Sequence, residues 1–272
     1  MKQLLCLLLF CGGYLNLYSQ VDTDNERGRP ANNNPSYFSL SLGIGPSKMK
    51  NSYLSELTSS GTTFNISSNI SSYKKWGIQD WKFQIKYRES DSFDDDTETF
   101  FLSASHFRHK LVHRNMNNTF FMHVGGGIHA EFGTSGREKA SGYNQNSLNA
   151  YLNIEPSFLL KYRFKLGRQQ FDFSQQLSTP LAGAAILPQY GFMVHTSISD
   201  SENTDLGFAF TSLHNMWGIK SSSYLDWRLT SNGTERNTFI RLGIEYTGCR
   251  VSYKTKHQLG ETLFTLGFVY KL

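Results

Sequence analysis

Segments in which apolar and polar residues alternate recur along most of the chain. Successive side chains of a β-strand point to opposite faces, so a period of two predicts strands that each have one apolar face. The alternation is clearest over residues 148–166, where Leu152 and Ile154 share one face and Asn153 and Glu155 share the other. By the same pattern, the predicted strands are residues 37–45, 62–73, 81–88, 100–108, 119–133, 148–166, 170–179, 190–199, 206–213, 219–230, 238–250 and 262–272.

The connections between these segments differ in length from one end of the strands to the other. With the first turn placed outside, the outer connections are residues 89–98, 134–146, 180–189 and 254–261. The inner connections are residues 165–169, 200–205 and 231–237, with 110–118 as a longer exception.

Pro156 lies within a strand and cannot donate a hydrogen bond to the ladder, so we expect a β-bulge there.

The last predicted strand has the most specific pattern. Phe264, Leu266, Phe268, Tyr270 and Leu272 alternate with smaller or polar residues. With its glycine and its aromatic residues, this strand resembles the closing strand of Gram-negative outer-membrane β-barrels, which the barrel-assembly machinery reads during biogenesis. The sequence departs from the common form in one place, because Leu272 stands where Phe is usual. The assembly signal that the resemblance implies comprises Gly267, Phe268, Tyr270 and Leu272.

The resemblance implies an all-β fold, a transmembrane antiparallel up-and-down β-barrel of about twelve strands, with ten or fourteen as alternatives. It also implies a location in the outer membrane of a Gram-negative bacterium. An even strand count places both ends of the barrel on the periplasmic side. The strongest alternative is a soluble β-sandwich or lipocalin-like barrel, whose apolar face would be internal. Long strands, and charged residues such as Lys161 and Arg163 opposite an apolar face, favour the membrane barrel.

The N-terminal residues predict export. Lys2 precedes an apolar stretch over residues 4–10, and small or polar residues follow, which is typical of a secretory signal peptide. We therefore expect a cleaved signal over residues 1–19, a flexible periplasmic leader over 20–36 and a barrel domain over 37–272. A lipoprotein signal ending at Cys11 is an alternative, although Phe10 is larger than the residue usual before such a cysteine.

Composition and charge are compatible with a barrel. The mean hydropathy of −0.41 resembles that of a soluble protein, but polar residues that face a lumen dilute the hydropathy of a barrel. The net charge of +5 is not accompanied by a basic helix or finger motif, so we expect no nucleic acid partner. The partners we expect are outer-membrane lipids and lipopolysaccharide. Cys249 is the one cysteine outside the predicted signal, so no internal disulfide is expected.

Three groups of residues resemble reactive or metal-binding sites. His106, His109 and His113 lie close in sequence, but they alternate between faces, and neighbouring cations disfavour a metal. The acidic residues of 89–98 lack the order and the glycine of an EF-hand loop. Ser212 and His214 have the spacing for one strand face, where a hydroxyl and a base can meet. We expect neither a metal nor a cofactor.

Charged residues on the polar faces of the strands are the main candidate for function. Those predicted to face the lumen, as a pore lining or as internal salt bridges, are Lys82, Lys86, Arg88, Glu131, Glu155, Lys161, Arg163, Asp226, Arg228, Arg241 and Glu245. Basic residues outnumber acidic ones in this set. The leading hypothesis is therefore a passive channel for small solutes with a bias towards anions. A structural or accessory barrel of an outer-membrane assembly and an outer-membrane lipid-modifying hydrolase stay open as alternatives.

Overall fold

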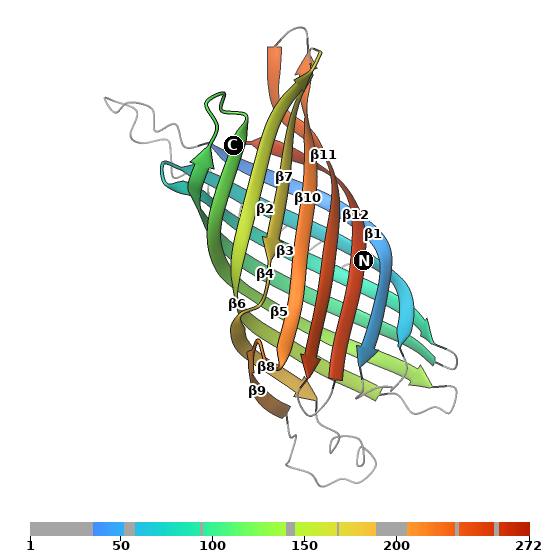
Figure 1. Ribbon diagram of the computed structural model, residues 1–272. Helices are drawn as coiled ribbons and strands as arrows, with labels where there is room; N and C mark the ends of the chain where they lie inside the picture. Colours follow the sequence, from blue (N-terminus) through green and yellow to red (C-terminus); the bar gives the residue numbers. More distant parts are fainter. Residues whose placement is uncertain are drawn as a thin grey trace, which may run out of the picture. The chain divides into compact units, whose positions relative to one another are not determined.

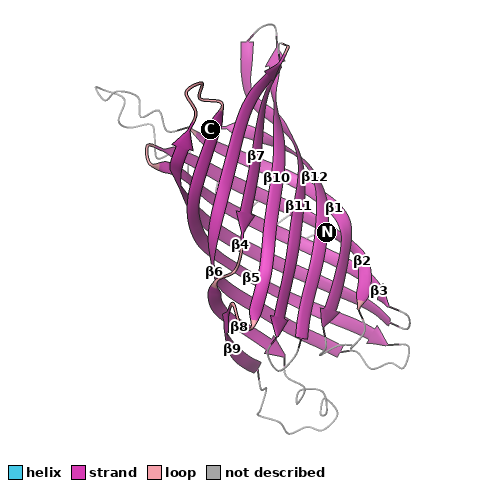
Figure 2. Cartoon of the chain, in the orientation of Figure 1, coloured by secondary structure: helices cyan, strands magenta, loops and turns pink. Residues whose placement is uncertain are grey.

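The computed structural model is an antiparallel β-barrel (Figures 1 and 2). The structure describes residues 35–51, 58–92, 95–139, 145–167, 169–188, 206–231, 234–252 and 256–272. The strands are β1 (Ser36–Asn51), β2 (Ser59–Lys74), β3 (Gly77–Ser92), β4 (Asp95–Arg114), β5 (Phe120–Lys139), β6 (Gln145–Leu166), β7 (Gln169–Ser178), β8 (Ala182–Pro188), β9 (Leu206–Ser212), β10 (Met216–Ser231), β11 (Thr234–Ser252) and β12 (Lys256–Lys271). None of the described residues forms a helix long and apolar enough to cross a membrane. The predicted signal peptide and nearly all of the predicted leader lie outside the described residues.

Ten of the twelve strands form the closed wall. Each of β1 to β6 pairs with the next strand, and β7 pairs with β10. From there β10 pairs with β11 and β11 with β12, which returns to pair with β1. The paired residues can be followed from strand to strand around the wall, starting at Gly43 of β1. In the direction of β2 they reach β6 at Asn149, and in the direction of β12 they reach β6 at Lys161. The strands are therefore staggered around the barrel, and such a stagger requires them to tilt from the barrel axis.

The remaining two strands form a hairpin at one end of the wall, visible beside β6 in Figure 1. β8 pairs with the first half of β6, from Ala150 to Ile154, while β7 pairs with the second half, from Ser157 onward. The prediction of a loop over 180–189 is therefore wrong for residues 182–188, a run of small and apolar residues that forms a strand along β6 beyond the end of β7. The predicted strand 190–199 and the predicted turn 200–205 lie outside the described residues.

The irregularity expected at Pro156 lies on the neighbouring strand. Pro156 itself stays in register with Gly126 of β5. On its other side, residues 179–181 interrupt the line between β7 and β8. The Thr179 amide donates to the Pro156 carbonyl (3.3 Å) and the Leu181 amide to the Ile154 carbonyl (2.9 Å).

The two faces of the wall differ as the alternation predicted. Ile154 is 57% exposed on the outer face, whereas the next residue, Asn153, is 2% exposed in the interior. Large apolar side chains cover the outer face, including Leu42, Phe83, Leu102, Leu242 and Phe264. The interior holds mainly polar and charged side chains. An apolar outer belt around a polar interior is the arrangement of a transmembrane β-barrel, so the predicted fold class is confirmed.

Several strands extend further than predicted. β3 runs to Ser92 and β4 begins at Asp95, so most of the predicted acidic loop 89–98 belongs to a ladder. β12 begins at Lys256, inside the predicted connection 254–261. The apolar alternation stops before these ladders end, because backbone pairing continues where the side chains on both faces are polar.

The closing strand gives a prediction about assembly. Phe268 and Tyr270 are exposed on the outer face of β12, which closes the barrel against β1. Replacing both with Ala should lower the amount of folded barrel in the membrane, because the change removes lipid-facing area and the aromatic part of the predicted assembly signal. Heat-modifiable gel mobility of membrane fractions measures the compact form. An unchanged amount of that form would contradict the prediction.

Candidate functional site: the barrel interior

The long strands β3, β6, β10 and β11 bring most of the predicted lumen charges into the barrel interior. There they pair with one another across the lumen, because the barrel is narrow enough for long side chains from non-adjacent strands to meet. Such charges need partners when they are removed from water.

The first cluster surrounds Glu245 of β11. Lys82 of β3 donates from Nζ to Glu245 Oε1 (2.9 Å) and to the Tyr224 hydroxyl (3.1 Å). Gln84 Nε2 donates to the other carboxylate oxygen (3.1 Å), and the Tyr224 hydroxyl also donates to the carboxylate. Three strands separate β3 from β11 in the wall, so this cluster spans the lumen.

The second cluster surrounds Glu261 of β12. Lys86 Nζ lies 2.5 Å from one carboxylate oxygen, and Arg88 Nη2 lies 3.3 Å from the other. Arg88 also donates to Thr63 Oγ1 (3.3 Å) and contacts Met49 Sδ (3.1 Å). The side chains of Arg88 and Glu261 are each 1% exposed, so water does not reach them from either mouth of the barrel.

Two further carboxylates are paired inside the barrel, and for one of them the partner lies on the adjacent strand. Glu155 of β6 is fully buried and accepts from Lys220 Nζ (2.5 Å) and from Ser178 Oγ (3.0 Å). Asp226 of β10 forms a two-pronged pair with Arg241 of β11, with distances of 2.7 and 2.8 Å. Arg241 in addition donates to Ser39 Oγ of β1 (3.1 Å), which ties a third strand to this pair.

The other predicted lumen residues lie in different surroundings. Lys161 of β6 donates to the Tyr73 hydroxyl of β2, across the lumen. Glu131 lies 3.6 Å from His129, two residues away on the same face of β5. Arg163 pairs with Asp172 (2.9 Å), but its side chain is half exposed near the β6–β7 turn. The Arg228 guanidinium lies over the Phe239 ring, 5.0 Å from its centre.

Sequence reasoning missed four charged residues of the interior, three of them acidic: Asp80, Asp172, Lys220 and Glu261. Asp80 lies two residues before Lys82 on β3, so both side chains are on the same face of the strand. Its Oδ2 is 3.6 Å from His109 Nδ1. Glu261 was placed in a connection, although it alternates in phase with Leu263 and Thr265, which are both buried. The missed residues therefore reduce the basic excess on which the anion preference was predicted.

The end of the interior nearest β8 is apolar. Tyr151, Ala185, Met216 and Val251 form a buried cluster that draws on β6, β8, β10 and β11. The Tyr151 hydroxyl lies 3.2 Å from His257 Nδ1 of β12. The β8–β9 hairpin thus contributes one residue, Ala185, to an apolar cluster inside the barrel.

The three histidines do not converge on a common site. The His106 ring stacks on Trp81 at 4.1 Å, and His109 points into the interior, 2.9 Å from Ser157 Oγ. The His113 ring lies 6.3 Å from that of Phe120. Within the described ranges, no group of three or more His, Cys, Asp or Glu residues is arranged to hold a metal ion. The side chains of residues 91–96, which include the acidic run, are outside the description.

Ser212 and His214 do meet. The Ser212 hydroxyl and His214 Nδ1 share a hydrogen bond on the exposed turn between β9 and β10. Asn215 serves this turn as a structural cap, since its side chain accepts from the Ser212 amide (2.7 Å) and donates to the Phe210 carbonyl (2.7 Å). In the part of the chain that the structure describes, no carboxylate pairs with His214, so the orienting third group of a hydrolase is not assembled here.

A family model described as "Protein of unknown function (DUF3316)" matches residues 3–271, so the chain belongs to this family. No curated protein matches the chain. Among solved structures, it is similar to the outer membrane protease OmpT from Escherichia coli, with 7% identity and a TM-score of 0.44 over 91% of this chain and 99% of that chain. It is also similar to the translocator domain of the autotransporter NalP from Neisseria meningitidis (7% identity, TM-score 0.41, 99% and 97% covered). A third is Neisserial surface protein A (10% identity, TM-score 0.35, 86% and 97% covered).

Proposed function

We propose that this member of the DUF3316 family is a sealed outer-membrane barrel, a structural or accessory component that acts through its surface and not through its interior. The observation that carries the proposal is the burial of charges inside the barrel. Arg88, Glu155 and Glu261 are each no more than 2% exposed, although all three side chains face the lumen. In a water-filled pore, side chains in these positions would be solvated.

The ion pairs explain how the interior stays filled. Each cross-lumen pair joins strands that do not touch in the wall, so the side chains occupy the space through which a solute would pass. A barrel of ten strands is small enough for this, since barrels of about eight strands are filled by side chains and those of sixteen or more are open. The apolar cluster around Tyr151 and Met216 adds a second barrier at the end nearest β8.

The outer membrane is the proposed location for two reasons. The exposed apolar belt needs lipid to cover it, because a soluble protein would not leave Leu42, Ile154 and Phe264 each at least half exposed. The closing strand has the pattern of outer-membrane barrels. The barrel-assembly machinery is accordingly the partner proposed for biogenesis.

The anion channel predicted from the sequence is the competing function. The channel hypothesis requires a basic lumen, and the predicted lumen charges on which it rests do not include Glu261 or Lys220. These two residues complete the ion pairs with Lys86, Arg88 and Glu155, and this pairing favours the sealed barrel. The contact between Ser212 and His214 supports a lipid hydrolase as a further candidate. It is a weaker one, because no carboxylate among the described residues pairs with His214.

Permeation of small solutes distinguishes a sealed barrel from a channel. We expect vesicles that contain the refolded protein to swell in an isotonic sugar solution no faster than empty vesicles. A general-diffusion porin in the same lipid serves as the positive control, and heat-modifiable mobility shows that the barrel has folded. Swelling that increases with the amount of folded protein would contradict the proposal.

A further inference from the structure

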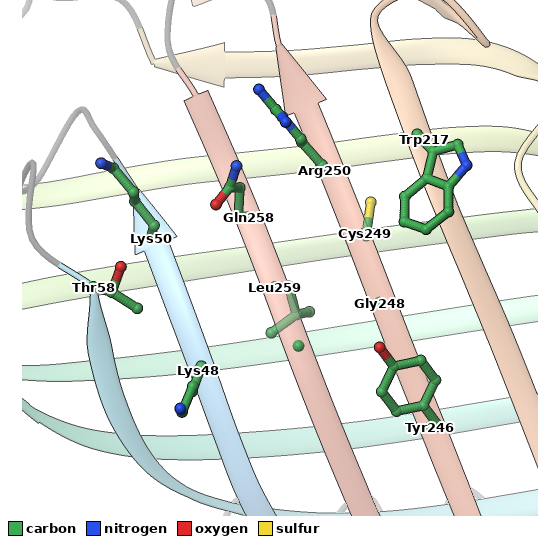
Figure 3. Close-up of a pocket in the computed structure, with 11 residues that line it drawn as sticks. Lys48, Lys50, Thr58, Trp217, Tyr246, Gly248, Cys249, Arg250, Gln258 and Leu259 are labelled. Atoms are coloured by element: carbon green, nitrogen blue, oxygen red, sulfur yellow. The ribbon is translucent and has the colours of Figure 1, made fainter.

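A shallow groove of about 370 Å³ lies across the ends of four neighbouring strands of the wall (Figure 3). The strands are β10, β11, β12 and β1, and the groove is close to the connection between β11 and β12. This is the end of the barrel predicted to face the outside. One of its lining residues, Cys249, also packs against the interior cluster around Tyr151.

The groove opens on the outer, lipid-facing side of the wall. On β1, the exposed Lys48 alternates with Ser47 and Met49, which are buried towards the interior, and it continues the outward face of Leu42 and Ile44. On β11, Arg250 likewise continues an outward face, that of Leu242, Ile244 and Tyr246. The two lysines and the arginine of the groove therefore point towards the membrane surface and not into the lumen.

The strand register places the lining residues in two adjacent rows. Lys50, Gln258, Arg250 and Trp217 lie side by side across β1, β12, β11 and β10, as Figure 3 shows. In the next row Lys48 lies beside Gly260, which lies beside Gly248. Both glycines line the groove, and the Tyr246 side chain lies over Gly248, where an added Cβ would be 2.8 Å from its hydroxyl oxygen. A Cβ added at Gly260 would have no atom within 4 Å, so the space above this residue is open.

The chemistry of the groove matches an anionic amphiphile. Lys48, Lys50 and Arg250 supply three cations, and none of the described lining residues is acidic. Lysine and arginine are the residues that bind phosphate oxygens. Trp217 and Tyr246 flank the site, and such aromatic residues are typical of the level of the lipid head groups. Further along the same strands, the exposed Ile44, Ile244 and Phe264 offer an apolar surface for acyl chains.

We propose that this groove binds the phosphorylated head group of an outer-leaflet lipid of the lipopolysaccharide type, with its acyl chains packed along β1, β11 and β12. The inference rests on the proposed function only in placing the barrel in the outer membrane. It does not depend on whether the lumen is sealed. Bound lipid would cover Lys48, Lys50 and Arg250 at the ends of these strands. It would also fix the depth of the barrel in the outer leaflet.

Native mass spectrometry of the full-length protein, refolded in detergent and titrated with diphosphoryl lipid A, tests the proposal. We expect one tightly bound lipid, and we expect the substitutions Lys48→Gln and Arg250→Gln each to weaken binding by about tenfold, as for loss of one charged hydrogen bond. Gly260→Leu should reduce binding by at least as much, because its side chain would extend into the space that is open at the Cβ position. Lys165→Gln, an equal change of charge at the exposed β6–β7 turn, is the matched control and should leave binding unchanged.

The outcomes separate the possible sources of affinity. Equal binding of dephosphorylated lipid A would overturn the proposal, because the cations would then not matter. So would undiminished binding by a folded Lys48→Gln/Arg250→Gln double variant or by folded Gly260→Leu, since the lipid would then lie elsewhere. A barrel that binds lipid A in the groove and also passes sugars would contradict only the proposed function, whereas a sealed barrel that does not bind would contradict only this inference.

Discussion

Replacing Glu261 with Ala should cost the barrel about 3–5 kcal/mol of unfolding free energy, the largest loss we expect from a single interior substitution. The carboxylate is the shared partner of Lys86 and Arg88, and the Arg88 side chain is 1% exposed. Without it, two cations stay in a site that water does not reach. The cost comes from this uncompensated charge more than from the lost attraction of the pair.

Urea titrations in lipid vesicles, followed by tryptophan fluorescence, measure the effect. The matched control is Glu89→Ala, the same truncation at an exposed position of β3, which should change the unfolding free energy by no more than about 0.5 kcal/mol. Replacing Lys86, Arg88 and Glu261 together with Met should recover most of the stability, because no buried charge is then left without a partner. Equal, small losses in Glu261→Ala and Glu89→Ala would show that water fills the interior.

Replacing Leu242 with Arg should cost roughly 2–4 kcal/mol, the penalty for a cation at the middle of the lipid-facing side of a barrel. Leu242 is 53% exposed, and its register partners are Leu225 of β10 and Leu266 of β12, so it lies well inside the apolar belt. The same vesicle titrations measure the loss.

Depth in the membrane provides the control for this prediction. Leu166 is 71% exposed but ends β6 beside the turn at Gly167, so Leu166→Arg places the cation near the membrane interface. There the expected cost is about 0–1 kcal/mol. Similar costs at the two positions would mean that the apolar belt does not lie in lipid.

The alternation of side chains was sufficient to predict the class of fold and the two faces of the wall. Ile154 and Asn153 illustrate this, since a period of two assigns adjacent residues to opposite faces whatever the pairing partners are. The alternation does not reveal which strands close the wall. The run over Ala182–Pro188 consists of small and apolar residues without a polar alternation, yet it forms a strand. It pairs with β9 on one side and with one half of β6 on the other, because β6 is long enough to accept two partners in line.

The partners of the interior charges could not be predicted from the sequence. Lys82 and Glu245 lie on strands that are not neighbours, and the tilt of the strands decides which residues share a level of the lumen. Glu261 shows a simpler failure. The apolar alternation predicts a last strand that begins at residue 262, one residue after Glu261, whereas the backbone pairing of β12 begins at Lys256.

The current through single refolded barrels in a planar lipid bilayer shows whether the interior is sealed. For a sealed barrel we expect no conductance steps above those of the bare bilayer in symmetric salt, from protein shown by its gel mobility to be folded. Steady steps with a reversal potential favouring anions, shifted towards cations by Lys161→Glu and Arg163→Glu, would contradict the sealed barrel and would support the channel.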